Sequence, residues 1–187
     1  MEQMAITIHI CEKQIIYREL GLIAYNIQTD KVVTVGEECL KYLESDEIAV
    51  LSPFADGKIA EFELAVVMFH ELLKRAYVKA GVKSRFKRRR FTICTEQTMT
   101  SIDKKVIMDC FYQMSKNVEI SDTTYQEHSR MLLGNQATDR KSKEIIIAFE
   151  VEDHAAFIKD SLQRIIEKAA GWGMSREEVL RLCKDMD

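Results

Sequence analysis

Apolar residues over the first 35 positions follow the short period of β-strands. The segments 5–10, 14–20, 21–27 and 31–36 are rich in Ile, Val and Tyr, which favour extended backbone. The residues QTDK at 28–31 supply turn chemistry before the last of these segments. The pattern therefore predicts a β-meander in this part of the chain.

The apolar period then changes to that of a helix. Between residues 61 and 79, apolar side chains recur at spacings of three and four, which places them on one helical face. That face consists of Phe62, Val66, Phe69, Leu73, Ala76 and Tyr77. Gly81 is expected to end this helix. Before it, residues 37–43 predict a short helix, and residues 48–60 predict an extended segment broken by Pro53 and a turn.

Helices and strands alternate after residue 90. Residues 91–95 and 117–121 predict short strands, and residues 125–133 predict a helix. Between the two strands, Thr100 and Asp103 have the spacing of a capping box, in which each side chain bonds the other residue's backbone at a helix start. Strands followed by alternating helices and strands are typical of an α/β fold.

A continuous apolar run occupies residues 145–149. It lacks the alternation of a strand with one solvated face, so we expect a strand that is covered on both faces. The last forty residues predict two helices, interrupted by GWG at 171–173. Ser175 and Glu178 have the spacing that caps the second helix.

Charge and cysteine content bear on the broad function classes. The balance of 27 basic and 30 acidic residues gives a net charge of −3, so no global field attracts nucleic acid or an acidic membrane. The five cysteines are widely spaced without a CxxC pair, which favours reduced thiols over disulfides or a zinc site. No segment approaches the roughly 18 apolar residues of a membrane span, and no leader is evident. We expect a cytoplasmic protein without a metal or cofactor.

Two neighbouring segments carry a more specific pattern. VVTVGEECLKYL precedes IAVLSPFADGKIAEFE, in which Pro53, Asp56 and Gly57 stand at fixed spacing. This pattern resembles the first half of the MreB-type bacterial actin-like (rod shape-determining) family, with its Val-Gly-Glu-Glu turn and Pro-x-x-Asp-Gly-x-Ile-Ala-Asp-Phe-Glu motif. The pair Arg18-Glu19 and the segment FTICTEQTMTSIDKKVI extend the resemblance in both directions, and only the tail lies outside it.

The resemblance implies a ribonuclease H-like, actin-like ATPase half-domain. Such a half has a five-stranded mixed sheet flanked by helices, and ATP lies between two halves. We accordingly expect an actin-fold subdomain over residues 1–151, completed by a strand at 145–151, and a C-terminal helical hairpin over residues 152–187.

Three requirements of the family's ATP chemistry are not met in this sequence. Aligned on Arg18-Glu19, Met1 falls inside the family's first phosphate loop, so that loop and the strand before it are expected to be missing. Ser101 follows Thr100 where the family has its catalytic Glu, and a hydroxyl is a poor base at neutral pH. Residues 134–154 replace the glycine-rich second loop. We therefore expect no catalytic or cofactor-binding residues, with Asp56 and Gly57 serving as turn residues.

Loss of the family's first strand would leave unpaired strand edges in the middle of the sheet, which is costly because buried backbone groups must be hydrogen-bonded. We therefore hypothesise that residues 145–149 insert at that position. The competing possibility is that this strand is swapped into a partner molecule, which predicts a dimer.

Two surface features are candidate partner contacts. Six positive charges lie within eight residues, at Lys83, Arg85, Lys87, Arg88, Arg89 and Arg90. They suit a phosphate surface, an acidic protein or an anionic leaflet, although a solvated loop is the favoured interpretation. Trp172, between two glycines, is either an interface anchor or a cover for the end of a core.

These observations favour a non-catalytic protein-interaction module linked to cell shape or cytoskeletal assembly. Its expected partner is a second copy or an actin-like cytoskeletal protein, with a homodimer as one possibility, and not nucleic acid. Two alternatives stay open. One is an ATP-binding protein that completes its site with a partner chain, and the other is nucleic-acid or anionic-surface binding through residues 83–90.

Overall fold

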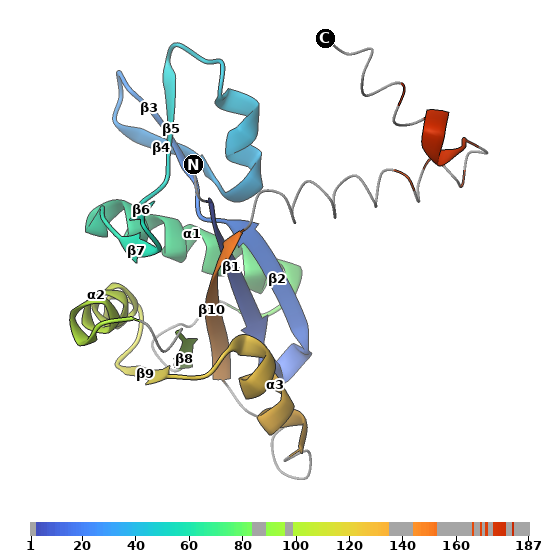
Figure 1. Ribbon diagram of the computed structural model, residues 1–187. Helices are drawn as coiled ribbons and strands as arrows, with labels where there is room; N and C mark the ends of the chain where they lie inside the picture. The colour runs from blue at the N-terminus through green and yellow to red at the C-terminus, as the bar shows by residue number, and fades with distance from the viewer. Residues whose placement is uncertain are drawn as a thin grey trace. The chain divides into compact units, whose positions relative to one another are not determined.

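The structure is a computed structural model, and it describes the chain with several gaps. The described residues are 3–83, 89–95, 99–134 and 144–152, together with 166, 169, 171, 174–178 and 181. The chain divides into two compact units, Met1–Val151 and Glu152–Asp187. The fold is α/β (Figure 1).

A five-stranded mixed sheet is the main element of the first unit. Its strands are β1 (Gln3–Ile10), β2 (Ile15–Leu20), β8 (Arg90–Cys94), β9 (Asn117–Ser121) and β10 (Glu144–Glu152). Their order across the sheet is β2-β1-β10-β8-β9. The β1–β2 pair is antiparallel, whereas β10 and β9 both run parallel to β8. The strand that comes last along the chain therefore lies at the centre of the sheet.

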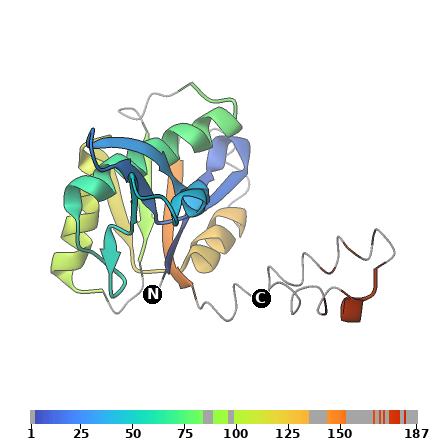
Figure 2. The same cartoon turned by 90° about the horizontal axis from the view of Figure 1, so that it is seen from above.

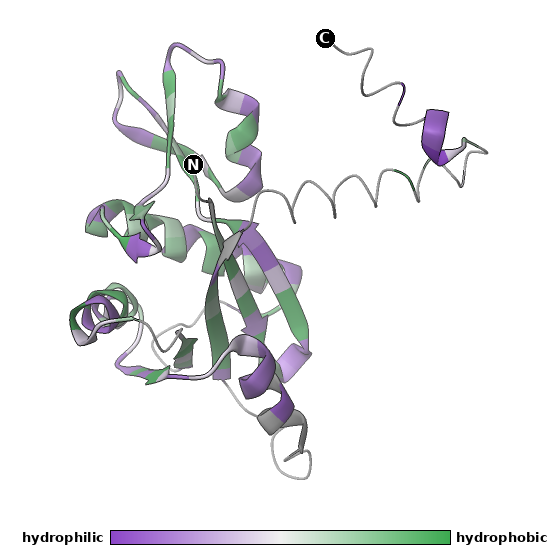
Figure 3. Cartoon of the chain, in the orientation of Figure 1, coloured by the Kyte–Doolittle hydropathy of each residue, from purple (hydrophilic) through white to green (hydrophobic). Residues whose placement is uncertain are grey.

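The side chains of β10 explain why it is buried on both faces. Ile145, Ile147 and Phe149 point into the main core, whereas Ile146 and Ala148 point into a smaller cluster on the opposite face. All five side chains are buried. In Figure 3, hydrophobic colouring runs along β1 and β10, and it also appears on α1 and α2. The absence of alternation in the sequence thus corresponds to a strand with two covered faces.

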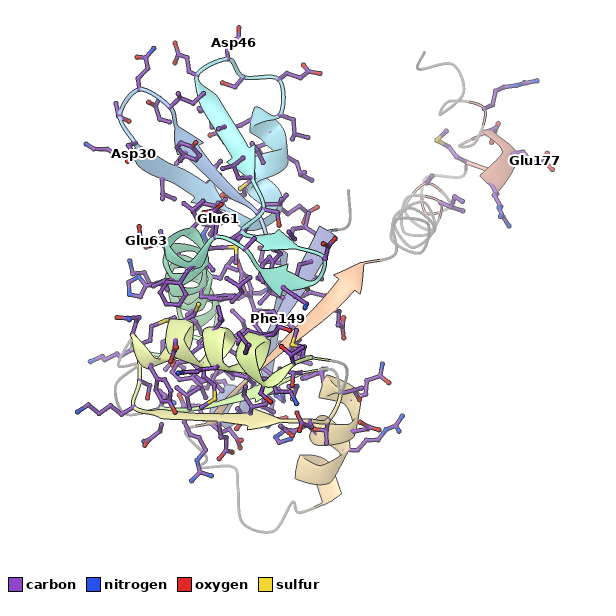
Figure 4. The ribbon with its side chains drawn as sticks, turned by 60° about the vertical axis from the view of Figure 1, so that its left-hand side comes forward. Asp30, Asp46, Glu61, Glu63, Phe149 and Glu177 are labelled. Atoms are coloured by element: carbon purple, nitrogen blue, oxygen red, sulfur yellow. The ribbon has the colours of Figure 1, made fainter. Side chains whose placement is uncertain are left out.

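Helices cover the two faces of the sheet unequally. Helices α1 (Phe62–Lys79) and α2 (Ser101–Tyr112) pack on the main core. Helix α3 (Tyr125–Gly134) packs Tyr125 on the smaller cluster. Figure 2 shows α2 and α3 on opposite sides of β10. In Figure 4, Phe149 lies among the side chains of the main core, where its ring is 5.6 Å from that of Phe69.

The prediction of one continuous meander is wrong, because the chain leaves the sheet after β2. Strands β3 (Ile23–Asn26), β4 (Lys31–Val35) and β5 (Ile48–Leu51) form a separate three-stranded sheet in the order β4-β3-β5. Between β4 and β5, residues Gly36–Tyr42 form the 3-10 helix η2. At Gly21, the break point, the backbone N–H donates to Met4 O at 2.6 Å, and a Cβ would lie 2.7 Å from the Phe54 ring.

Helix α1 buries a different stripe from the predicted one. Phe69, Leu73, Ala76 and Tyr77 of the predicted face are buried, but Phe62 is 38% exposed and Val66 is only partly buried. Ala65, Met68 and Leu72 are buried as well. The helix ends at Gly81 as predicted, in a Schellman motif: Val82 N–H donates to Tyr77 O and Gly81 N–H donates to Val78 O.

A small hairpin precedes α1. Strands β6 (Phe54–Ala55) and β7 (Lys58–Ile59) pair antiparallel, and the turn between them places Asp56 and Gly57 at φ values of 50° and 72°. The two-residue turn with positive φ at both positions matches hairpin chemistry. In the second unit, Ser175 and Glu178 form the expected capping pair: Ser175 N–H donates to Glu178 Oε2 at 2.7 Å, and Glu178 N–H donates to Ser175 Oγ at 3.2 Å.

Candidate functional site

Ligands of open α/β sheets bind beyond the carboxyl ends of the parallel strands, so this edge is the candidate site. Here β8 and β10 end next to the start of α3, around a cavity of about 240 Å³. Its lining consists of Cys94, Thr95, Thr123, Thr124, Tyr125, Gln126, Ala148, Phe149 and Glu150. The lining is rich in hydroxyl groups and contains a carboxylate, but neither a basic residue nor a glycine.

The start of α3 faces this edge, and its backbone N–H groups at Thr124 and Glu127 are already hydrogen-bonded. Thr124 and Glu127 form a capping box: Glu127 Oε2 accepts from Thr124 N–H at 3.0 Å and from the Thr124 hydroxyl at 3.1 Å. Glu127 N–H donates in turn to Thr124 Oγ1 at 3.3 Å. The hydrogen bonds from Thr124 hold the pKa of Glu127 below its usual range, so a negative charge occupies this helix N-terminus.

Glu150 adds a second negative charge to the same edge. Its carboxylate pairs with the Arg18 guanidinium of β2 at 3.3 Å, and both side chains are about half exposed. Glu150 is the one charged residue among the described residues of the cavity wall, which holds no lysine, arginine or glycine that could contact a bound phosphate. The described residues of this edge therefore do not fit a triphosphate.

The central strand also lacks the turn that a phosphate loop of this fold requires. Such a loop joins the central strand directly to its neighbour, so that backbone N–H groups of the turn face the phosphates. β10 lies next to β1, and the two run in opposite directions (Figure 1). After Glu152, however, the chain continues into the second unit instead of turning into β1.

No activated nucleophile is found among the described residues of this edge. Burial raises the pKa of the Cys94 thiol to about 11, so the thiol is protonated at neutral pH. His9 Nδ1 lies 3.5 Å from the Tyr125 hydroxyl, and burial lowers the pKa of His9. This contact links the start of α3 to β1.

A polar cluster around the buried Thr92 and Glu144 lies on the α3 side of the sheet. The Thr92 hydroxyl donates to Glu144 Oε1 at 2.6 Å, and Glu119 Oε1 lies 3.1 Å from the same hydroxyl oxygen. His128 Nε2 is 3.8 Å from Glu144 Oε1. These four residues come from β8, β10, β9 and α3. Sequence reasoning missed the cluster because only the sheet order brings its members together.

A second network fixes the junction between the two sheets of the first unit. Glu19 of β2 accepts from the Tyr17 hydroxyl and from Glu37 N–H, both at 2.8 Å. Gly36 has a φ of 79°, and a Cβ there would clash with Glu19 Oε2. Arg75 of α1 donates to Val35 O at 3.0 Å. Glu19 of the Arg-Glu pair is thus hydrogen-bonded to Glu37 of the Val-Gly-Glu-Glu turn, and Gly36 leaves room for the Glu19 carboxylate.

Comparison with known proteins decides the family. The MreB/Mbl protein family model matches residues 3–128, about two thirds of the chain. The chain belongs to the MreB/Mbl family.

Similar MreB/Mbl proteins include cell shape-determining protein Mbl of two species. The chain is 34% identical to Mbl of Bacillus cereus and 32% identical to Mbl of Bacillus subtilis, in each case over 106 residues. These matches cover 56% of this chain and 31% of each relative, so the chain spans about a third of the length of the relatives it matches.

Among solved structures, MreB5 of Spiroplasma citri matches at 22% identity in its AMPPNP-bound form. The match covers 65% of this chain and 35% of that one, with a TM-score of 0.48. The ADP-bound form of the same protein matches at 19% identity, also with a TM-score of 0.48.

The MreB/Mbl turn motif packs against the start of α2. Pro53 is buried, and its carbonyl accepts from Ala60 N–H and Glu61 N–H at 2.9 and 3.2 Å. Asp56 is exposed in the turn. Lys58 Nζ lies 3.2 Å from Asp103 Oδ2, which links the hairpin to the helix that carries Ser101. The structure thus brings the motif close to the position where the MreB/Mbl family has its catalytic Glu.

The basic run of this MreB/Mbl chain is not uniformly solvated where the structure describes it. Lys83 and Arg90 are exposed, but Arg89 is 8% exposed and its guanidinium lies 2.8 Å from Glu12 Oε1. Arg89 also stacks over the Tyr77 ring at 5.7 Å. The favoured solvated-loop interpretation therefore fails at Arg89, because its side chain is buried against Glu12 and Tyr77. Arg85, Lys87, Arg88 and Trp172 lie outside the described residues.

Two other kinds of site are absent from the described part of the chain. It holds no group of three or more His, Cys, Asp or Glu side chains that could bind a metal ion. Within the same residues, no helix is long and apolar enough to cross a membrane. The described cysteines, Cys11, Cys39, Cys94 and Cys110, are all buried.

Proposed function

We propose that this chain is a non-catalytic MreB-like module that binds protein partners in cell-shape or cytoskeletal assembly and does not hydrolyse ATP. Membership of the MreB/Mbl family supports the biological setting, because the curated relatives are named as cell shape-determining proteins. The expected partner is a second copy of the chain or an actin-like cytoskeletal protein.

One observation carries the non-catalytic part of the proposal. The central strand β10 is not joined to β1 by a turn, so the backbone cradle that would hold a phosphate between these strands is replaced by a chain leading to residues 153–187. The capping carboxylate of Glu127 and the carboxylate of Glu150 support the same conclusion, since both oppose a bound phosphate.

A surface groove with exposed valines supports the interaction part. It lies between β4 and α1, where Val32, Val33 and Val67 are each about 40% exposed. Glu71 and Arg75 add both signs of charge to its wall. Neighbouring apolar side chains with a polar rim are typical of protein-binding surfaces.

Two measurements test the proposal. Phosphate release from Mg-ATP by the purified chain is expected to equal the buffer background, and steady turnover above that background would refute the non-catalytic part. Co-sedimentation with filaments of a full-length MreB-type protein is expected to show saturable binding. Val33→Asp should weaken that binding at least tenfold, because it charges the groove.

Ile102→Asp is the matched control, since Ile102 is 76% exposed on α2 and outside the groove. Binding by this variant should equal that of the parent chain. The interaction part is refuted if the parent chain binds neither the filaments nor itself.

A further inference from the structure

Strand β10 holds together two parts of the sheet that are otherwise separate. On one side, β1 pairs with β2, and on the other side β8 pairs with β9. In the sheet order, β10 alone connects these pairs. Without it, β1 and β8 would each present an unpaired edge towards the same slot, and exposed strand edges recruit other strands.

β10, which fills this slot, is the last strand in the sequence order of the described residues. Its partner residues are distant in sequence: Ile145 pairs with Phe91 and Ala148 pairs with Cys94. The segment before it, residues 135–143, has the sequence NQATDRKSK and contains a single apolar residue. Long-range pairing forms late because loop closure must precede it. A chain in which β10 has not yet paired therefore has an empty slot between β1 and β8 and an exposed apolar strand.

Side-chain contacts at both ends of β10 fix its register between β1 and β8. The Glu144 carboxylate accepts from the buried Thr92 hydroxyl at 2.6 Å, which fixes the register at the start of β10. At the other end, Glu150 pairs with Arg18 across β1. A slip by one residue would move Ile145 and Ile147 out of the main core and break both contacts. The same β10 from another copy satisfies all of these contacts equally well.

We propose that two copies of this chain exchange β10, so that Glu144–Glu152 of each copy completes the sheet of the other. The contacts are the same in the closed monomer and in the exchanged dimer, which makes exchange a low-cost route to a dimer. Because β10 is followed by a separate compact unit, its transfer carries residues 152–187 along without breaking contacts inside that unit. The exchange does not depend on the proposed function.

The Arg18–Glu150 pair provides a direct test. Arg18→Cys and Glu150→Cys single variants of the full chain are mixed in denaturant, refolded together and treated with a short bismaleimide. All variants carry Cys183→Ser, because Cys183 lies outside the described residues. Positions 18 and 150 are about half exposed, whereas the described native cysteines are buried. In an exchanged dimer, the thiol introduced at position 18 of one copy lies next to the thiol introduced at position 150 of the other. We expect a cross-linked species of twice 21.6 kDa and a dimer by light scattering.

The matched control mixes Arg18→Cys with Ile102→Cys, whose thiol is exposed on α2. This mixture should give at least tenfold less cross-linked dimer. The double variant Arg18→Cys/Glu150→Cys should cross-link in either state, which shows that the slot is filled. A monomer over a wide concentration range, with cross-links only within one chain, would overturn the proposal. A dimer that yields no cross-link between positions 18 and 150 of different copies would overturn it equally, because another surface would then hold the dimer.

Discussion

Single residues at the junction between the two sheets show how the family motifs act in the structure. Gly36 has a left-handed backbone and lies against the Glu19 carboxylate, which accepts from Glu37 N–H. A side chain at residue 36 would be strained by the positive φ and would also displace Glu19. The motif glycine is thus required for two separate reasons.

Gly36→Ala should therefore cost more stability than Gly81→Ala. Gly81 also has a positive φ, but a Cβ there meets nothing within 4 Å. We expect a loss of about 1 kcal/mol at Gly81 from backbone strain alone, and about 3 kcal/mol at Gly36 because a charge-assisted hydrogen bond is lost as well. Urea denaturation measures the free energy of unfolding of both variants. In a Glu19→Ala background the Gly36→Ala loss should shrink to that of Gly81→Ala, and equal losses in the parent chain would contradict this account.

Arg89 is buried, although it belongs to a run of basic residues that the sequence alone suggests is exposed. Its guanidinium pairs with Glu12 at 2.8 Å and lies over the Tyr77 ring, and its side chain is only 10% exposed. Its neighbour Arg90 is exposed. The sequence places both in one basic run, and only the contacts of Arg89 with Glu12 and Tyr77, which are distant in sequence, separate their environments.

Arg89→Ala should destabilise the chain far more than Arg90→Ala. Removal of Arg89 leaves the Glu12 carboxylate partly buried without its cation, which costs about 3 kcal/mol. Arg90→Ala should change the free energy of unfolding by less than about 0.5 kcal/mol, as expected for an exposed site. Thermal and chemical denaturation distinguish the two outcomes. If Arg90→Ala were as damaging as Arg89→Ala, the buried ion pair would not explain the difference.

Among the elements, helix α2 has the best-defined start. Thr100 Oγ1 accepts from Asp103 N–H at 3.2 Å, and Asp103 Oδ2 accepts from Thr100 N–H at 3.2 Å. The Thr100 side chain and then Lys58 hold the pKa of Asp103 below its usual range. A lowered folded-state pKa stabilises the fold above the unfolded-state pKa, and this stabilisation disappears as the pH falls through the folded-state value.

Thr100→Ala should remove the cap and flatten this acid dependence. We expect a loss of about 1 kcal/mol at neutral pH, which is typical of an N-cap threonine. As the pH falls below the usual carboxyl range, the parent chain should lose stability and approach the variant. Ser101→Ala is the control, because Ser101 is exposed and forms no part of the capping box. Unfolding curves at several pH values would contradict the account if the stability difference between Thr100→Ala and the parent chain stayed the same at every pH.

The helices and strands could be predicted where local periodicity determines them, and less well where contacts between distant residues determine the structure. The strands, the capping box of α2 and the end of α1 at Gly81 follow from short patterns. The division of the first strands into two sheets depends on Gly21 approaching Met4 and Phe54, which no local pattern reveals. Helix α1 contacts α2, β1 and β4, so its tertiary surroundings select the buried stripe.

At the scale of the whole molecule, the sheet order explains most of what distinguishes this chain. The apolar run at residues 145–149 predicts a doubly covered strand, and β10 lies at the centre of the sheet. The candidate site was less predictable. The sequence motifs point to glycine loops, whereas the carboxylates of this edge are Glu127 in the capping box of α3 and Glu150 in the cavity wall, which only the fold places there.

The central claim is that this MreB/Mbl chain keeps the family's α/β scaffold without a place for a triphosphate. Isothermal titration of the full chain with Mg-ATP tests it most directly. MreB5 of Spiroplasma citri, whose structure contains AMPPNP, serves as the reference under the same conditions. We predict only heats of dilution for this chain, alone and with a filament-forming relative present at a constant level. Saturable binding of one nucleotide per chain would contradict the account.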